Sequence, residues 1–373
     1  MLSFIEYLNA KPLFYKEIDY TRIHKAYDSL SPHIQTPKVI HLIGTNGKGS
    51  TGRTLAHLIH KNNKHSVMHY SSPHIVSFNE RIWIDGANSS DEVLQHSHKK
   101  LFSILGQEVS DGLSYFEYST LLAFVAGEDC DWIVLEAGLG GEYDATNVVS
   151  KKLSIITPIG LDHQEFLGES IEAIATTKIN SIEKEALLAI GNSDEVIGVA
   201  QKIAKQKGAR LHYASKKAQI VGFEGYLSDN IATALSALDI LEIEYHIEDL
   251  KTLKLFGRFY PLADNITIDV GHNPLSARQI AKTLGDKKLV LVYNTLEDKA
   301  YEEILQILKA NIKRVEYIAI DTPRALKQEA LKELLESMHI EFQKFSAINV
   351  DEEYLVYGSF YTVESFLNYY ENQ

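Results

Sequence analysis

The stretch Gly44-Thr45-Asn46-Gly47-Lys48-Gly49-Ser50-Thr51 combines glycines, a lysine and paired hydroxyls directly after an apolar run. Such a loop directs backbone N–H groups and a helix N-terminus at an anion. Lys48 would reach the outer phosphates of a nucleotide, and Ser50 or Thr51 would hold Mg²⁺. Because Gly49 separates Lys48 from Ser50, the generic phosphate-binding motif is matched only loosely, and a plain glycine turn is the alternative.

Two further candidates, Glu136 and His163, stand at the ends of predicted strands. An acidic residue one or two strands from a phosphate-binding loop commonly holds Mg²⁺, although a helix-capping carboxylate is the alternative for Glu136. Mg²⁺ prefers oxygen ligands. The residue types alone therefore favour a substrate, softer-metal or structural role for His163.

Three charged residues farther along the chain are weaker candidates. Lys178 lies in a helical stretch, where most lysines face solvent, but a lysine near a metal can take up CO₂ as an anionic carbamate ligand. Asp269 follows a strand and would bind ribose hydroxyls. Arg258 would hold phosphate or stack on adenine. An interdomain salt bridge is the alternative for both.

The elements that must position these residues alternate between apolar strands and amphipathic helices. The apolar runs cover residues 39–43, 66–70, 132–135 and 153–157. Continuously apolar strands of this kind are typical of a parallel sheet covered on both faces. Lys48, Ser72, Glu136 and His163 follow four of these strands, and open α/β sheets bind ligands at the carboxyl ends of their strands. We therefore expect one site at one edge of the sheet.

The remaining pattern predicts two domains, 1–255 and 256–373, which suits a chain of 373 residues. Helices are predicted over 3–35, 91–105, 117–127 and 228–243. A further strand is predicted at 187–190, and a second set of strands at 266–270, 289–293, 315–320 and 355–357. The fold class is α/β, with a mostly parallel N-terminal P-loop ATPase domain and a smaller C-terminal Rossmann-like domain.

Composition excludes several classes of function. A net charge of −13 argues against nucleic acid or an anionic membrane as a partner. The single cysteine, Cys130, fits a reducing compartment, and we expect a cytoplasmic protein. The N-terminus has no basic stretch typical of a signal peptide, and no apolar run approaches the ~20 residues of a membrane span.

A set of short motifs, in order along most of the chain, resembles the folylpolyglutamate synthase/dihydrofolate synthase family of the Mur ligase superfamily. They include Gly44-Thr45-Asn46-Gly47-Lys48-Gly49-Ser50 with its extra glycine, Tyr70-Ser71-Ser72-Pro73-His74, and Phe78-Asn79-Glu80-Arg81-Ile82. Others lie at 115–118, 135–141, 144–148, 161–163, 257–259, 272–274, 298–299, 323–325 and 358–360.

The resemblance implies an ATP- and Mg²⁺-dependent ligase that adds L-glutamate to dihydropteroate or folates through an acyl phosphate. We expect the protein to be a monomer. The resemblance implies ATP contacts from Thr45, Asn46, Gly47, Lys48, Gly49, Ser50, Asn230, Arg258 and Asp269. It implies metal ligation by Ser72, Glu136 and His163, and catalytic roles for Lys48, His272 and a carbamylated Lys178. It implies pterin contacts from Ile18, Asp19, Tyr20, Tyr115, Phe116, Glu117, Tyr118, Tyr143, Asp144 and Ala145.

Alternatives stay open at this point. The Tyr115-Phe116-Glu117 segment favours dihydropteroate as a substrate, whereas Glu142, where the bifunctional form of the family has arginine, leaves this undecided. A cell-wall Mur ligase is the second enzymatic reading, but no additional N-terminal domain for a nucleotide-linked substrate is evident. The non-enzymatic alternative is an ATP-binding regulator, which would have no use for Arg258 and Asp269.

Overall fold

The computed structural model describes residues 2–12, 19–217, 220 and 222–372. Contacts within the chain divide it into two compact units. The first comprises Met1–Gly222 and Ser228–Leu253, and the second comprises Phe223–Leu227 and Lys254–Gln373. The segment Phe223–Leu227 thus belongs to the second unit, which the sequence did not indicate. The predicted division at 255/256 itself stays a prediction.

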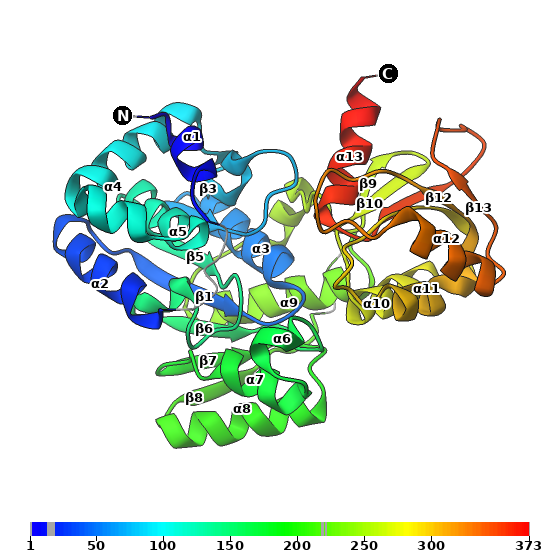
Figure 1. Cartoon of the computed structure of the whole chain (residues 1–373). Coiled ribbons are helices and arrows are strands. Elements are labelled where there is room, and N and C mark those ends of the chain that lie inside the picture. Colours follow the sequence, from blue (N-terminus) through cyan, green and yellow to red (C-terminus); the bar gives the residue numbers. More distant parts are fainter. Residues whose placement is uncertain (1, 13–18, 218–219, 221, 373) are drawn as a thin grey trace. The chain divides into compact units, whose positions relative to one another are not determined.

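The first unit is built on an eight-stranded sheet in the order β4-β3-β2-β5-β1-β6-β7-β8 (Figure 1). Its strands are β1 (Lys38–Ile43), β2 (Val67–Tyr70), β3 (Ile82–Ile84), β4 (Ala87–Asn88), β5 (Trp132–Glu136), β6 (Leu153–Ile156), β7 (Glu185–Leu188) and β8 (Arg210–Tyr213). Only the pairs β2–β3 and β3–β4 are antiparallel. The predicted, mostly parallel sheet is therefore confirmed.

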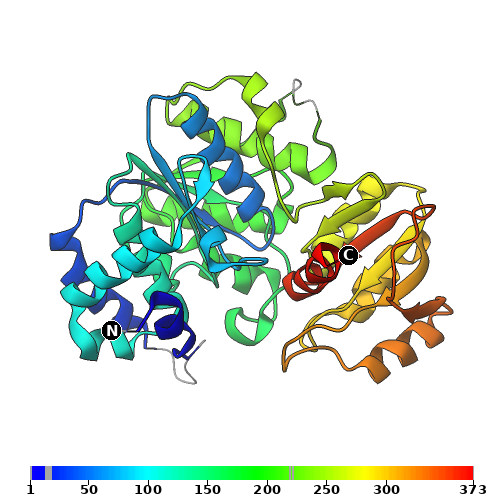
Figure 2. The same ribbon diagram turned by 90° about the horizontal axis from the view of Figure 1, so that it is seen from above.

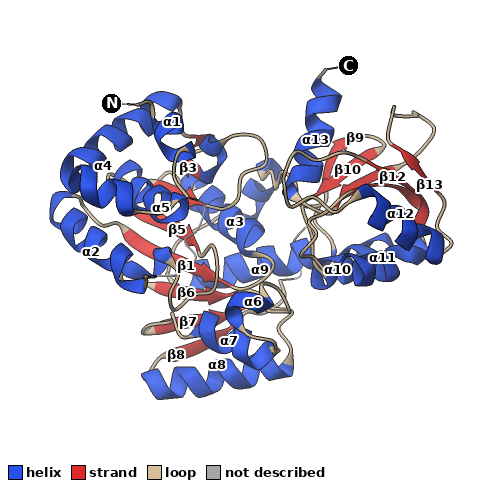
Figure 3. Cartoon of the chain, in the orientation of Figure 1, coloured by secondary structure: helices blue, strands red, loops and turns tan. Residues whose placement is uncertain are grey.

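Helices cover both faces of this sheet (Figure 3). They are α1 (Phe4–Asn9), α2 (Tyr20–Leu30), α3 (Lys48–Lys61), α4 (Asp91–Gly112), α5 (Tyr115–Ala126), α6 (Gln164–Leu167), α7 (Ile171–Ile179), α8 (Asp194–Lys207) and α9 (Gly225–Ile240). Of the described residues, none belongs to a helix long and apolar enough to cross a membrane.

The single helix predicted over 3–35 is wrong, because the structure forms two helices there. Helix α1 ends at Asn9, and Pro12 disfavours helical backbone in the residue before it. Helix α2 begins afresh with Asp19 as its N-cap, which accepts a hydrogen bond from the backbone N–H of Thr21.

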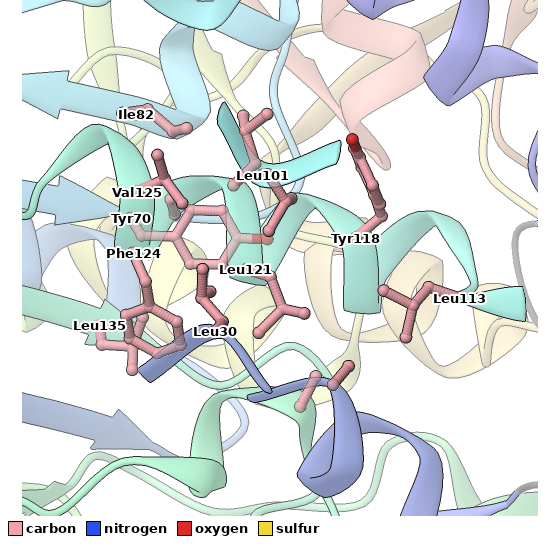
Figure 4. Close-up of a cluster of buried hydrophobic side chains, with 14 of the residues drawn as sticks. Leu30, Tyr70, Ile82, Leu101, Leu113, Tyr118, Leu121, Phe124, Val125 and Leu135 are labelled. Atoms are coloured by element: carbon pink, nitrogen blue, oxygen red, sulfur yellow. The ribbon is translucent and has the colours of Figure 1, made fainter. Parts of the chain in front are cut away.

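The two faces of the sheet are packed differently. On one face, α2, α4 and α5 bury a cluster that includes Leu30, Tyr70, Tyr118, Phe124 and Leu135 (Figure 4). The opposite face of β2 and β5 is covered by α3. Because side chains alternate along a strand, His69 and Glu136 point toward α3 while Tyr70 and Leu135 point toward the cluster.

The second unit holds a six-stranded sheet in the order β13-β12-β11-β14-β10-β9, parallel except for the pair β9–β10. Its strands are β9 (Tyr260–Ala263), β10 (Ile266–Asp269), β11 (Leu289–Tyr293), β12 (Ile312–Tyr317), β13 (Phe342–Lys344) and β14 (Tyr354–Tyr357). Its helices are α10 (Pro274–Leu284), α11 (Tyr301–Leu308), α12 (Gln328–Ser337) and α13 (Phe360–Glu371). Figure 2 shows α13, coloured red, nearly end-on beside these strands.

Candidate active site

The four strands that carry the predicted site residues are consecutive neighbours in the sheet, in the order β2-β5-β1-β6. Glu136 ends β5 opposite Leu42 of β1, while Leu135 is opposite Tyr70 of β2. Ser72 therefore follows the strand next to that of Glu136, at the same edge. The phosphate-binding loop follows β1, and His163 lies beyond the end of β6, so the structure brings these strand ends together.

The loop after β1 has the predicted strand–loop–helix form. Helix α3 begins at Lys48, and Gly47 precedes it with φ +88°, a left-handed conformation that suits glycine. The backbone N–H groups of Thr45 and Asn46 donate to the carbonyl of Pro158, each at 3.0 Å. The Nζ of Lys48 donates to the carbonyls of Gly44 and Thr45 at 2.9 and 3.3 Å. The side chain of Lys48 thus folds back onto the phosphate-binding loop.

Asn230 of α9 contacts the same loop. Its Nδ2 donates to Ser50 Oγ at 2.7 Å, and its Oδ1 would lie 2.8 Å from a Cβ atom placed on Gly47. The predicted ATP-binding residues Asn230, Gly47 and Ser50 are therefore in contact. Thr51 is fully buried, and its hydroxyl makes no hydrogen bond within the described part of the chain.

We expect Gly44→Ala to destabilise the loop. Gly44 has φ +145°, and an added Cβ would lie 2.0 Å from Thr157 Oγ1 and 2.7 Å from its carbonyl oxygen. Overpacking of this kind costs about 1–3 kcal/mol, and the strained backbone adds to it. Thermal and urea unfolding would measure the loss. Gly198→Ala in α8 is the control, since a Cβ there meets open space and should stabilise by about 0.5–1 kcal/mol. Equal stability of both variants would contradict this account.

Lys178 is 4% exposed at the end of α7. Burial, followed by the charge of Lys48, lowers the pKa of Lys178 to about 7, and the carboxylates of Asp162 and Asp144 act in the opposite direction. The lysine is therefore close enough to interact with the phosphate-binding loop, with the residue before His163 and with the predicted pterin residue Asp144. Its backbone also lies 2.2 Å from a Cβ placed on Gly141, so only glycine fits there.

The predicted metal ligands differ in their surroundings. Glu136 is 2% exposed, and its Oε1 accepts a hydrogen bond from Nε2 of His69 at 2.6 Å. His163 has φ +52°, precedes α6 and keeps its Nε2 3.9 Å from Asp162 Oδ2. Ser72 lies in a loop fastened by Glu80, whose carboxylate accepts hydrogen bonds from backbone N–H groups at 75–77. Common ligation of one metal by these residues stays a prediction.

Several predicted pterin residues gather beside the glycine-rich loop after β5. The rings of Tyr20 and Tyr143 lie 4.4 Å apart, and both side chains are exposed. The ring of Phe116 lies against Gly138. Asp144 accepts hydrogen bonds from the backbone N–H groups of Leu139 and Thr146. Ala145 is buried beside it, and burial raises the pKa of Asp144.

The other predicted pterin residues that the structure describes contact side chains or backbone of the protein itself. Glu117 binds the guanidinium of Arg22 through both carboxylate oxygens at 2.8–3.2 Å. Tyr118 is fully buried in the core, with its OH 2.7 Å from His98 Nδ1, and Asp19 caps α2. The ring of Tyr115 packs against the guanidinium of Arg81 at 5.2 Å. Ile18 lies outside the described residues. The pterin roles stay predictions.

Arg258, Asp269 and His272 belong to the second unit. Asp269 is 3% exposed and accepts hydrogen bonds from Tyr226 OH, Phe259 N and Gly271 N at 2.6–2.8 Å. Burial raises the pKa of this carboxyl, although the hydrogen bonds oppose the rise. The guanidinium of Arg258 lies 5.3 Å from the centre of the Phe360 ring. The ATP-binding roles of Arg258 and Asp269 stay predictions.

Comparisons with known proteins agree with this arrangement. The Mur ligase middle domain family matches residues 43–262. The dihydrofolate synthase/folylpolyglutamate synthase of Escherichia coli K12 is 31% identical, across 97% of this chain and 93% of its own. The chain belongs to the dihydrofolate synthase/folylpolyglutamate synthase family.

Solved structures of this family have the same fold. Helicobacter pylori folylpolyglutamate synthetase is 37% identical, covers 99% of this chain and 98% of its own, and aligns with a TM-score of 0.76. A bifunctional folylpolyglutamate synthase/dihydrofolate synthase, solved with Mn, AMPPNP and L-glutamate bound, is 27% identical with a TM-score of 0.83, covering 98% and 97%. The relatives named here are folate enzymes, and their similarity to this chain extends over nearly its whole length.

Sequence reasoning missed two features of the candidate site. His69, the partner of Glu136, sits inside an apolar strand, where a histidine gives no periodic signal. Thr157 and Pro158 hold the phosphate-binding loop, although they follow a different strand. The apolar run before Thr157 predicted the strand but not this contact across the sheet edge.

Proposed function

We propose that this protein is an ATP-dependent ligase that joins L-glutamate to dihydropteroate and to folates, and so serves folate biosynthesis and one-carbon metabolism. The observation that carries the proposal is the adjacency of β2, β5, β1 and β6, whose ends bear Ser72, Glu136, the phosphate-binding loop and His163. A phosphate-binding loop beside a carboxylate that can hold Mg²⁺ is the arrangement that enzymes use for phosphoryl transfer from ATP.

The reaction follows in two steps. The γ-phosphoryl group of ATP moves to a carboxylate oxygen of the pteroate or folate, and ADP leaves. The amine nitrogen of glutamate then forms the new C–N bond, while the C–O bond to phosphate breaks and the nitrogen loses a proton. Lys48 and the N-terminal N–H groups of α3 would stabilise the negative charge that develops on the phosphate oxygens.

The metal and the remaining residues have roles that fit their surroundings. A buried carboxylate at Glu136, with a hydroxyl at Ser72 and an imidazole at His163 on neighbouring strand ends, suits a divalent ion, which would neutralise phosphate charge. Lys178 would supply a carbamate. Asn230, Arg258 and Asp269 would bind ATP, and His272 would act near the phosphates.

We further propose that the reaction takes place in the cytoplasm and that the protein acts as a monomer. A single cysteine cannot form an internal disulfide, which fits a reducing compartment. The net charge of −13 disfavours nucleic acid and anionic membranes as partners.

The test is ligation of isotope-labelled glutamate in the presence of ATP and Mg²⁺, with dihydropteroate and reduced folates assayed separately. We expect labelled amide product and one ADP for each glutamate joined. Product with folates but not with dihydropteroate would restrict the activity to polyglutamate synthesis. Absence of product with every acceptor would refute the proposal. An ATP hydrolysis rate that does not change when glutamate is added would favour the alternative of an ATP-binding regulatory protein.

A further inference from the structure

A histidine and a glutamate form a buried, hydrogen-bonded pair beneath helix α3. His69 lies in β2, Glu136 is the last residue of β5, and their side chains are 1% and 3% exposed. The His69 Nε2 and Glu136 Oε1 atoms are 2.6 Å apart. A contact this short between two buried polar groups constrains the direction of the carboxylate strongly.

The backbone explains why these two side chains meet. In the parallel pair β2–β5, His69 is opposite Val134, so Glu136 lies two residues farther along on the same face. Helix α3 closes the space above them at Gly52. A Cβ on Gly52 would lie 2.6 Å from His69 Nε2 and 3.2 Å from Glu136 Oε1. The helix backbone therefore leaves no room for another group beside this hydrogen bond.

The chemistry of the pair assigns different tasks to the two oxygens of Glu136. An ionised carboxylate can only accept, so the imidazole must donate from Nε2 to Oε1. The imidazole therefore fixes Oε1, the oxygen that it contacts. A cation at this strand end would be bound by the other oxygen, whose position follows from that of the fixed one.

We propose that His69 is a positioning residue that orients Glu136 and thereby sets the strength of divalent-metal binding at this sheet edge. The proposal rests on the metal-ligand role of Glu136 in the proposed function. Hydrogen-bond partners of metal ligands typically contribute about 10–100-fold to metal affinity. His69 should act on metal affinity in this range without touching substrate or nucleotide.

Two amide substitutions separate the hydrogen bond from the mere presence of a polar side chain. The terminal nitrogen of glutamine can occupy the place of His69 Nε2, whereas that of asparagine reaches only the place of Nδ1. We expect His69→Asn to raise the Kd for Mn²⁺, measured by electron paramagnetic resonance with AMPPNP present, by about 10–100-fold. His69→Gln should stay within about threefold of the unsubstituted protein.

The assay has controls for folding and for the ion. Circular dichroism and thermal unfolding verify that each variant is folded, and His69→Leu replaces the asparagine variant if that one is not. His57→Gln is the matched control, because its buried ring binds the backbone carbonyl of Asp249 at 2.9 Å and no predicted ligand. It should leave the Kd for Mn²⁺ unchanged, and kcat at saturating Mg²⁺ should recover largely in His69→Asn.

Unchanged Mn²⁺ affinity in a folded His69→Asn or His69→Leu would overturn the proposal. Equal weakening by asparagine and glutamine would overturn it as well, since packing rather than donation would then matter. Both results differ from failure of the proposed function, which would appear in the unsubstituted protein as absence of glutamate ligation.

Discussion

Replacing Lys48 with alanine should lower the rate of glutamate ligation by about 10²–10³-fold, the usual cost of removing one donor from a site that stabilises developing negative charge. Its effect on folding should be moderate. The partly buried amine donates to the carbonyls of Gly44 and Thr45, and hydrogen bonds made by charged groups contribute about 1.5–3 kcal/mol each.

Single-turnover ligation of labelled glutamate, with ATP varied, would measure this effect alongside urea unfolding. Lys61→Ala at the exposed end of the same helix is the matched control, and it should leave both rate and stability nearly unchanged. Full ligation by the Lys48 variant would mean that the loop is a structural turn. A large loss of stability would mean that the lysine mainly holds the loop together.

The second large effect should come from Lys178. The proposed carbamate would form on the neutral amine, and a pKa of about 7 makes a large neutral fraction available near physiological pH. At fixed dissolved CO₂ the ligation rate should therefore rise as pH increases from about 6 to 8, since deprotonation of the ammonium precedes carbamate formation. Removing CO₂ from the buffer should lower the rate reversibly.

Lys178→Ala should reduce the rate by about 100-fold or more, and short carboxylates such as acetate should restore part of it by replacing the carbamate oxygens. Lys151→Ala is the control. Lys151 is also a buried lysine of the first unit, but it is ion-paired with Glu183. Its loss should affect stability and leave the CO₂ response intact. A rate independent of CO₂ in the unsubstituted protein would rule out the carbamate.

Much of this site could be predicted because strand ends in a parallel sheet share one edge. The apolar runs located β1, β5 and β11 closely, and the polar residues after them indicated where a ligand would bind. The short strands β4 and β8 were not predicted, because exposed edge strands lack a continuous apolar run. The order of the strands in the sheet could not be predicted from the sequence either, since no local signal places β5 between β2 and β1.

Individual side chains were harder to interpret than elements. Tyr118 stands in a motif of the family and yet lies in the core, because the helix that carries it turns that position toward Tyr7 and His98. His69 gave no signal at all. In both cases the direction of a side chain depends on which face of an element is covered, and that follows from tertiary packing.

The insertion of β5 between β2 and β1 has a consequence for how the protein is made. Until residues 132–136 have left the ribosome, neither β1 nor β2 has its shared parallel neighbour, although β1 ends at Ile43 and β2 at Tyr70. Such long-range pairing closes slowly and leaves strand edges open to other chains meanwhile. Translation pauses or truncations before Trp132 should therefore yield nascent chains that aggregate.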